Sequence, residues 1–528
     1  ADKARQPCPS WNQPRDSERR TLTTFRSRWC DRTATLTNTR FSDASRERYV
    51  MRVGMVNQTH AVVRELTLAL CTCGLRTVPR WWGTVMRRVV LIGSVALSLS
   101  ACVGDYTGPG LPASDTPQSW GREIPSDTAI WPSQTWWKHF GSDELNTLIA
   151  AAQASNLNLA AARFRVEQAD AQARIAGSSL LHTIGANVRA DESGDIHGPG
   201  LKTKLLGASL SASYELDFWG RNMADARAAD ASLRASQYDQ ETVALTTTAS
   251  IATTYFQLLA ARDRLAYTKK NVENADRLLA LTELQFKAGL ISPLQMAQQQ
   301  NIVASQRAQL PAIAQQERQA AASLALLLGR PPQGFAVQAQ SLAGLQTPGV
   351  APGLPSELLA RRPDVKRAEA NLAAADANVG AARAAFLPTI SLTGNASVAS
   401  TALSGLLNGQ NAAYAIASSL LQTIFDGGAI AAREDAAMAR RKELLTTYRS
   451  AALTAFSDVD VTLASVANLE EQERQQAKAA AAAAEAFRIA ELQYRAGLVD
   501  YLNVLNAQTS MFQAQDQLAQ VRGSRLQA

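Results

Sequence analysis

One nine-residue stretch occurs twice in this chain and limits strongly what the chain can fold into. Residues 284–292 read Leu-Gln-Phe-Lys-Ala-Gly-Leu-Ile-Ser, and residues 492–500 read Leu-Gln-Tyr-Arg-Ala-Gly-Leu-Val-Asp, at a shift of 208 residues. In each copy a glycine stands where a helix needs a left-handed C-cap, and the final serine or aspartate is suited to cap a following helix. The repeat therefore predicts two helices that stop, turn sharply and return antiparallel.

Long helical runs lead into both turns. Residues 222–287 contain neither proline nor glycine, and 66 helical residues would span roughly 100 Å. Residues 429–495 form a second run of the same kind. A shorter helical pattern covers residues 143–180, and we expect Pro311 to kink or break the return helix that follows the first turn.

Each half also contains two stretches in which apolar and polar residues alternate, which is typical of strands with one apolar and one polar face. These stretches are residues 184–190 and 206–218 in the first half, and 389–398 and 414–425 in the second. The return strands end 207 residues apart, close to the shift of the turns, which indicates an internal duplication. Four such strands cannot close a pore, and open edges are not tolerated in lipid, so other copies of the chain must complete the sheet. The apolar faces would then meet lipid, and the Ser and Asn faces would line water.

The front of the chain has the layout of an export signal. Residues 86–88 are Met-Arg-Arg, residues 89–99 are apolar but too few to cross a bilayer, and small residues then precede Cys102. This layout resembles a bacterial lipobox, in which cleavage leaves the cysteine as a lipidated N-terminus inserted in membrane lipid. The alternative is a plain signal peptide with an incidental cysteine. From residue 102 onward Cys102 is the only cysteine, so no disulfide is expected within that part.

The expected organisation follows from these features. Residues 1–85 are interpreted as upstream or non-native sequence, 86–101 as the signal, 102–142 as a lipid-anchored tether, 143–328 as the first helix-hairpin-helix repeat, 329–356 as a Pro/Gly connector and 357–528 as the second repeat. The tether contains four tryptophans, which form either a membrane-interface belt or a clasp against neighbouring helices. They are Trp120, Trp131, Trp136 and Trp137.

Charge and residue content argue against two classes of protein. Of the 53 basic and 46 acidic residues, 17 and 7 precede Cys102, so the remainder carries a net charge of −3 and no nucleic-acid partner is expected. That part contains three histidines, no P-loop and no Gly-rich dinucleotide motif. Paired carboxylates such as Asp458 and Asp460 lie on a helical run, where a solvated face accounts for them. We therefore expect no enzyme, no cofactor and no metal site.

Several motifs resemble the outer-membrane efflux protein family, the TolC-like channels, and specifically its lipoprotein branch. They are the paired Ala-Gly-Leu turns, Leu-Leu-Ala-Arg-Arg-Pro-Asp-Val at 358–365, Phe-Leu-Pro-Thr-Ile at 386–390, Tyr-Glu-Leu-Asp-Phe-Trp-Gly-Arg at 214–221 and Ile-Phe-Asp-Gly-Gly at 424–428. The resemblance covers roughly residues 102–528. It implies a mainly α protein with a small β part, in which a long antiparallel coiled-coil barrel continues a transmembrane β-barrel that a homotrimer completes with four strands per protomer.

The resemblance also implies a function at the outer membrane. The chain would be the channel of a tripartite efflux system, passively conducting substrates from an inner-membrane efflux pump and a periplasmic adaptor protein to the exterior. Two alternatives remain: a duct for type I protein secretion, and a lipid-anchored coiled-coil scaffold, which would not explain the strands.

The expected functional residues lie at and beside the two turns. Gly289, Leu290, Gly497 and Leu498 are expected to dock the adaptor, although ordinary helix-stop glycines without a partner would look the same in sequence. Asp500, Asn503 and Asn506 are expected to surround the periplasmic aperture. The family often places Asp in this segment, where residues 502–507 are Leu-Asn-Val-Leu-Asn-Ala.

Overall fold

The structure is a computed structural model of the 528-residue chain, and it describes residues 117, 119–120, 135–196, 202–349, 355–406 and 408–528. The chain divides into two compact units, residues 1–99 and 100–528, and the second contains all the helices and strands described below. The predicted upstream extension, the signal segment and Cys102 lie outside the described residues, so their assignment stays a prediction.

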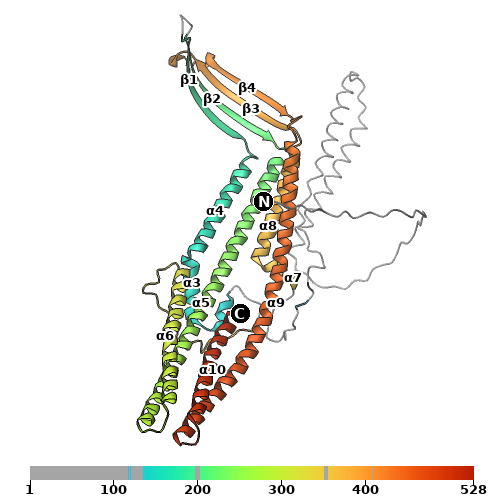
Figure 1. Cartoon of the computed structure of the whole chain (residues 1–528). Helices are drawn as coiled ribbons and strands as arrows, with labels where there is room; N and C mark the ends of the chain where they lie inside the picture. The colour runs from blue at the N-terminus through green and yellow to red at the C-terminus, as the bar shows by residue number, and fades with distance from the viewer. Residues whose placement is uncertain (1–116, 118, 121–134, 197–201, 350–354, 407) are drawn as a thin grey trace, which may run out of the picture. The chain divides into compact units, whose positions relative to one another are not determined.

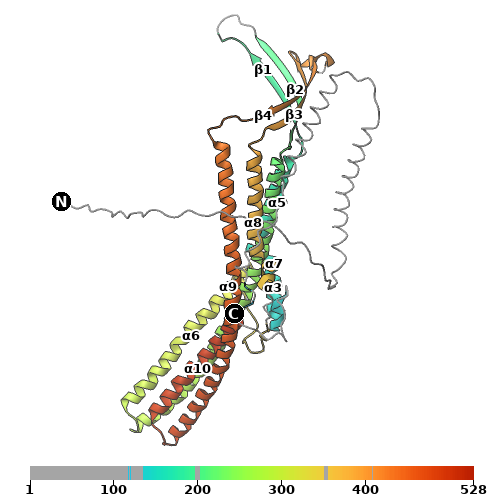
Figure 2. The same cartoon turned by 90° about the vertical axis from the view of Figure 1, so that its right-hand side faces the viewer.

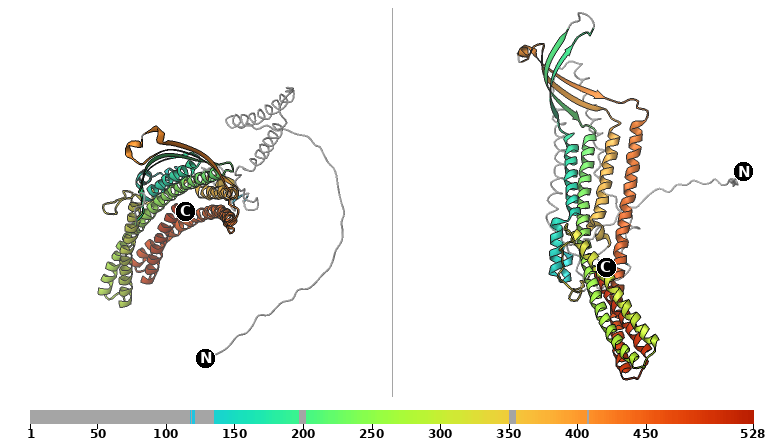
Figure 3. Two further views of the ribbon diagram at one scale, coloured as in Figure 1. Left: turned by 90° about the horizontal axis from the view of Figure 1, so that it is seen from above. Right: turned by 60° about the vertical axis from the view of Figure 1, so that its left-hand side comes forward.

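Two very long helices carry the architecture (Figure 1). Helices α5 (Arg221–Lys287) and α9 (Ala429–Arg495) have 67 residues each, which corresponds to roughly 100 Å. In the half next to the strands, α4 (Leu157–Ser178) packs beside α5, and α8 (Pro363–Ala384) packs between α5 and α9. These four helices form one curved row below the strands (Figure 3).

The other half of the row is made by the helices that return from the turns. Helix α6 (Pro293–Leu327) packs against α5, and α10 (Tyr501–Gln527) packs against both α9 and α5. Both turns lie at the end of the helices far from the strands (Figure 2). None of the helices in the described part of the chain is long and apolar enough to cross a membrane.

An aspartate caps the start of each long helix, although the two aspartates occupy different positions in the two repeats. The carboxylate of Asp217 accepts hydrogen bonds from the backbone N–H groups of Asn222 and Met223, at 3.1 and 2.7 Å. That of Asp426 accepts from Ile430, Ala429 and Gly428, at 2.7 to 3.1 Å. These N–H groups, above all that of Ile430, hold the pKa of the Asp426 carboxyl below its ordinary value. Each carboxylate thus satisfies N–H groups that a helix start leaves free.

The four strands form one antiparallel sheet in the order β1-β2-β3-β4. They span Thr183–Ser193, Thr203–Leu216, Thr389–Ser400 and Ala412–Leu421. The register places Leu210 opposite both Ala186 and Ala396, and Ser209 opposite both Asn187 and Ser397. The alternating pattern therefore becomes one apolar and one polar face, as predicted, and β1 and β4 are the edge strands.

The largest apolar core surrounds the middle of α5. Tyr255 and Phe256 are buried there against α3 (Asp143–Ser155), the end of α6 and the connector. Glu144 at the start of α3 fixes the connector by accepting the backbone N–H groups of Gln338 and Ala339 at 2.6 and 2.9 Å.

Three of the four tether tryptophans pack against helices. Trp136 and Trp137 belong to a short 3-10 helix (Trp136–Phe140) and pack in the core around α5. Trp120 meets the ring of Phe456 on α9 edge-on, with ring centroids 6.5 Å apart. The clasp interpretation therefore holds for these three, while Trp131 lies outside the described residues.

The Arg-Arg-Pro-Asp-Val motif joins helices in the second repeat. After the short α7 (Pro355–Arg361), Arg362 pairs with Asp364 at 2.7 Å and with Asp458 of α9 at 3.1 Å. The hydrogen bond from Arg362 holds the pKa of the Asp364 carboxyl below its ordinary value. The motif therefore ties the start of α8 to α9.

Two predictions about the elements were wrong, and a third was wrong in part. Residues 143–180 are two helices, because Asn156 ends α3 and caps α4: its Oδ1 accepts from Leu159 N at 2.9 Å, and its Nδ2 donates to Leu327 O at 2.7 Å. Of the kink or break expected at Pro311, the break is excluded, because α6 runs through the proline. Strand β4 ends at Leu421, because residues 422–425 leave the sheet instead of extending it to Phe425.

Candidate functional site

Both turns have the same backbone geometry. At the first turn, which we define as residues 288–292, Gly289 has φ = 72°, Leu290 N donates to Gln285 O at 2.9 Å and Gly289 N donates to Phe286 O at 2.9 Å. At the second turn, residues 496–500, Gly497 has φ = 70°, and the corresponding bonds measure 2.9 and 3.0 Å. This pair of bonds is the Schellman motif, which ends a helix with a left-handed residue. The predicted helix stops are confirmed.

The turns differ in how the next helix begins. Ser292 and Gln295 form a capping box, since the Ser292 side chain accepts from Gln295 N while Gln295 Oε1 accepts from Ser292 N at 2.8 Å. Asp500 occupies the N-cap position of α10, but its side chain makes no capping hydrogen bond. The prediction of a capping residue is therefore confirmed for Ser292 and wrong for the side chain of Asp500.

A leucine is exposed at each turn. Leu290 and Leu498 both have 75% of their surface accessible, although the residue after a Schellman glycine commonly packs back onto its own helix. A Cβ built at Gly289 or Gly497 would meet no atom within 4 Å. The glycines are thus required by the positive φ and not by crowding. The two leucines are two apolar surfaces that nothing in the described part of the chain covers.

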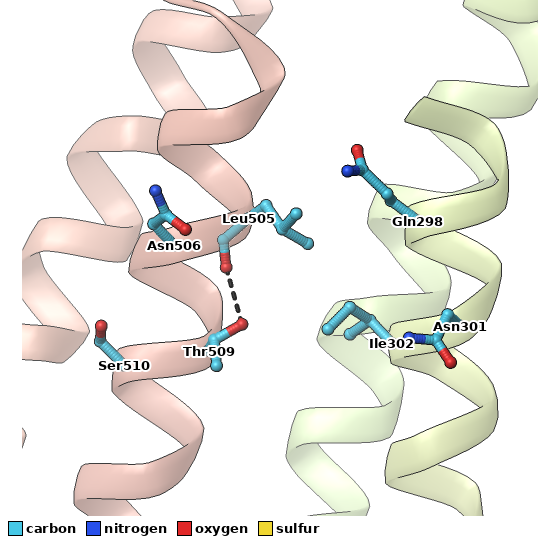
Figure 4. A pocket seen from close by; sticks show the side chains of 7 residues that line it. All are labelled: Gln298, Asn301, Ile302, Leu505, Asn506, Thr509 and Ser510. Atoms are coloured by element: carbon cyan, nitrogen blue, oxygen red, sulfur yellow. Dashed lines mark hydrogen bonds between the residues drawn. The ribbon is translucent and has the colours of Figure 1, made fainter. Parts of the chain in front are cut away.

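The predicted aperture residues lie on one exposed stretch of α10. Asp500, Asn503 and Asn506 are all exposed. Asn506 also lines a groove of about 370 Å³ between α10 and α6 (Figure 4). The groove is lined by amide and hydroxyl side chains over an apolar pair: Gln298, Asn301, Asn506, Thr509 and Ser510, with Ile302 and Leu505. It contains no charged group.

Polar side chains near the turns connect the two helical hairpins, α5–α6 and α9–α10. The hydroxyl of Tyr501 in α10 donates to Gln299 Oε1 of α6 at 2.7 Å, and Gln299 Nε2 donates to Ala275 O of α5 at 2.8 Å. Burial raises the pKa of the Tyr501 hydroxyl above its ordinary value, so it remains a donor. The hydroxyl of Tyr494 in α9 also bonds Gln285 of α5. Sequence reasoning missed these links, and the tyrosines that flank the second turn were the only signal for them.

A second set of links lies further from the turns, where α10 crosses α5. Arg264 Nε is 2.7 Å from Asp516 Oδ1, and Arg264 Nη1 donates to Gln316 of α6 at 2.8 Å. A Cβ built at Gly523 would lie 2.9 Å from the Cβ of Ala260. The two helices therefore lie in close contact at this crossing.

The apolar face of the sheet has the height of a membrane core. On β2 it runs from Leu206 to Leu216, which is roughly 34 Å along the strand, and a strand tilt of about 40° reduces this to about 25 Å. The face ends in a charged pair, Glu192 with Lys204 at 3.5 Å. Within the described residues no group of three His, Cys, Asp or Glu side chains could hold a metal ion.

Comparison with known proteins agrees with this arrangement. The model of the family described as outer membrane efflux protein matches residues 148–330 and 354–528. The pyoverdine export outer membrane protein OpmQ of Pseudomonas aeruginosa is 40% identical over 458 residues, which cover 84% of this chain and 95% of OpmQ. The cation efflux system protein CusC of Escherichia coli K12 is 30% identical over 438 residues, covering 82% and 95% of the two chains.

A solved channel has the same fold. The structure of the open state of the MtrE outer membrane channel of Neisseria gonorrhoeae superposes with a TM-score of 0.73 at 27% identity, covering 80% of this chain and 95% of MtrE. The proteins of this fold are trimeric channels with a helical barrel and a β-barrel.

Proposed function

This chain belongs to the outer membrane efflux protein family and is the outer-membrane component of an efflux system, and we propose that it acts as a passive channel, without catalysis, for substrates delivered by an inner-membrane pump through a periplasmic adaptor. One observation carries the proposal. The chain has a four-stranded sheet with a membrane-high apolar face and two free edges at one end, and two exposed turns at the other, joined by helices of roughly 100 Å.

The free edges account for the trimer. An unpaired strand edge leaves N–H and C=O groups without partners, and lipid cannot supply them. Pairing of β1 with β4 of the next copy satisfies both edges and closes the sheet around a lumen lined by the polar faces. The lipid-anchored scaffold considered from the sequence has no use for such a sheet.

The turns are proposed to dock the adaptor. Three copies place six turns at one end of the duct, and each turn presents a leucine that is 75% exposed. Burying a leucine side chain contributes about 1.5–3 kcal/mol, so a set of six supplies much of an interface. The positive φ of Gly289 and Gly497 gives both turns the same shape, so one adaptor surface fits either.

Replacing both exposed turn leucines with serine is expected to weaken adaptor binding by at least about tenfold while trimer levels stay normal. Site-specific cross-linking to the adaptor and drug accumulation in cells measure the two effects. Leu326→Ser is the matched control, because Leu326 is 66% exposed but lies at the other end of α6. Normal cross-linking and normal efflux in the variant with Leu290→Ser and Leu498→Ser would remove the turns from docking.

The aperture is proposed to lie beside the second turn. Asp500, Asn503 and Asn506 are exposed on the first two turns of α10, and in a trimer three copies of this polar stretch would face one another at the periplasmic end. Because the Asp500 side chain is not used as a cap, its charge is available to the permeating solute. The stretch is otherwise neutral, so we propose only a weak preference for cations.

We propose that Cys102 is lipidated and anchors the chain in the outer membrane. Labelled palmitate is expected to enter the wild-type protein and to be absent from Cys102→Ser, because the thiol is the acylated group. Deletion of residues 1–85 is expected to leave export unchanged. Export that fails after this deletion would show that the signal does not begin at Met86.

A further inference from the structure

A buried set of amide side chains between the two helical hairpins has unsatisfied hydrogen-bonding groups. Gln508 of α10 is fully buried, and neither its Oε1 nor its Nε2 has a hydrogen-bond partner among the described residues. Asn271 Oδ1 on α5 and Gln306 Oε1 on α6 are also buried without a partner. Nearly all buried polar groups in folded proteins are paired, so four such atoms in one region require a cause.

These three side chains lie at one level of the helices. The bond between Tyr501 and Gln299 fixes the register of the parallel helices α10 and α6. Seven residues further along each helix, which is two turns, Gln508 comes opposite Gln306.

The register of the antiparallel helices α5 and α10 places Asn271 at the same level along the helices. The ion pair of Arg264 with Asp516 fixes the register of this pair. Seven residues toward the turns lead from Arg264 to Asn271, and from Asp516 to Thr509, the neighbour of Gln508.

Water fits this level better than any charged ligand. In the packed arrangement the level has three amide oxygens and one amide nitrogen without a partner. These are enough to bind a water, which needs two to four polar partners, once the hairpins separate. The nearby groove between α6 and α10 includes Thr509 and is lined by neutral polar groups and one apolar pair (Figure 4), so water reaches the level through it when the hairpins begin to separate.

The interface between the hairpins contains both apolar and polar contacts. One apolar core near the turns contains residues of all four helices, among them Phe487 and Met511 of the α9–α10 hairpin and Leu278 of the α5–α6 hairpin. Between the hairpins, the contacts include the polar links of Tyr501 with Gln299 and of Arg264 with Asp516. A polar group loses little free energy when water replaces its partner, whereas an apolar group loses the favourable free energy of its burial.

We propose that Asn271, Gln306 and Gln508 form a hydration layer that lowers the free energy needed to separate the α9–α10 hairpin from the α5–α6 hairpin, and so favours opening of the duct at its turn end. In the packed arrangement the layer leaves amides unsatisfied, and in the separated arrangement water satisfies them. The inference rests on the channel function proposed above. The solved open state of MtrE shows that a channel of this fold is able to open.

The test changes the polarity of the layer in both directions. In Gln508→Leu the unsatisfied amide is removed, so the thermal midpoint of the purified trimer is expected to rise, and its open probability in a planar bilayer without adaptor or pump is expected to fall about tenfold. In Gln508→Glu the carboxylate loses more hydration free energy on burial than the amide does, so the open probability is expected to rise about tenfold. Each tenfold step corresponds to about 1.4 kcal/mol in the balance between open and closed states.

Gln513→Leu is the matched control, because Gln513 is on the same helix but exposed, and it is expected to change neither quantity. A lower thermal midpoint in Gln508→Leu would overturn the proposal, since it would show that the amide is satisfied in the folded trimer. A raised midpoint with unchanged open probability would overturn it too, since the hairpins would then not separate at this level. A wild-type trimer that never conducts would contradict the channel function instead, and the thermal comparison would still decide whether the layer is unsatisfied.

Discussion

Leu210→Arg is expected to abolish assembly of the trimer in the outer membrane. Leu210 lies near the middle of the apolar face of β2, between Ala186 and Ala396 on the neighbouring strands. An arginine facing lipid at the bilayer midplane costs about 2–4 kcal/mol, and three protomers raise this to about 6–12 kcal/mol per trimer. This is comparable to the whole stability of an ordinary domain, so heat-modifiable trimer on a gel should disappear.

Ser209→Arg is the matched control for Leu210→Arg. Ser209 is the preceding residue of β2 and lies on the polar face, opposite Asn187 and Ser397. An arginine there keeps its charge in water, so normal trimer levels are expected. Equal loss of trimer in both variants would mean that the two faces of the sheet are not separated into lipid and water.

Gly523→Leu is expected to destabilise the trimer strongly through a single helix crossing. Even a Cβ at this position would lie 2.9 Å from the Cβ of Ala260, so a leucine must push α10 away from α5. Overpacking of this kind costs about 1–3 kcal/mol, or about 3–9 kcal/mol for three protomers. The displacement would also strain the nearby ion pair of Arg264 with Asp516.

The measurement is the thermal midpoint of the purified trimer, compared with that of Gly380→Ala. Gly380 lies inside α8, and a Cβ there would be at an ordinary 3.8 Å from Ala224. Alanine favours a helix over glycine by about 1 kcal/mol, so Gly380→Ala is expected to raise the midpoint. A midpoint for Gly523→Leu that equals that of the wild type would show that α10 does not press on α5.

The sequence predicted the repeated elements because each depends on local chemistry. The absence of proline and glycine in residues 222–287 predicted a helix that the structure gives as Arg221–Lys287. The Ala-Gly-Leu turns were predictable because a positive φ selects glycine. The strand faces followed from alternation alone, and the register then aligned them across the sheet.

The errors occurred where tertiary contacts override local preference. Residues 155 and 156 are both suited to cap a helix, but the break between α3 and α4 is fixed by the end of α6, which bonds Asn156 through Leu327 O. Pro311 stays inside α6, where its missing N–H costs one hydrogen bond of a long helix. Asp500 looked like a cap in the sequence, but its side chain makes no capping hydrogen bond.

The links between the hairpins could not be predicted from one sequence. A buried glutamine such as Gln508 is indistinguishable in sequence from the exposed Gln513, because both occur in a Gln-rich helix. The pairing of Tyr501 with Gln299 spans 202 residues, and only the relative placement of two hairpins brings these side chains together.

The equal length of α5 and α9, 67 residues each, restricts how such a chain can change size during evolution. Inserting residues in one long helix alone would displace one turn from the other and shift every contact beyond the insertion. A change that keeps both turns level must occur in α5, α6, α9 and α10 together, and it must be a multiple of seven residues to preserve the packing phase. Length differences among relatives should therefore gather in the strand loops and the connector, and a natural lengthening of the duct should come as four matched insertions.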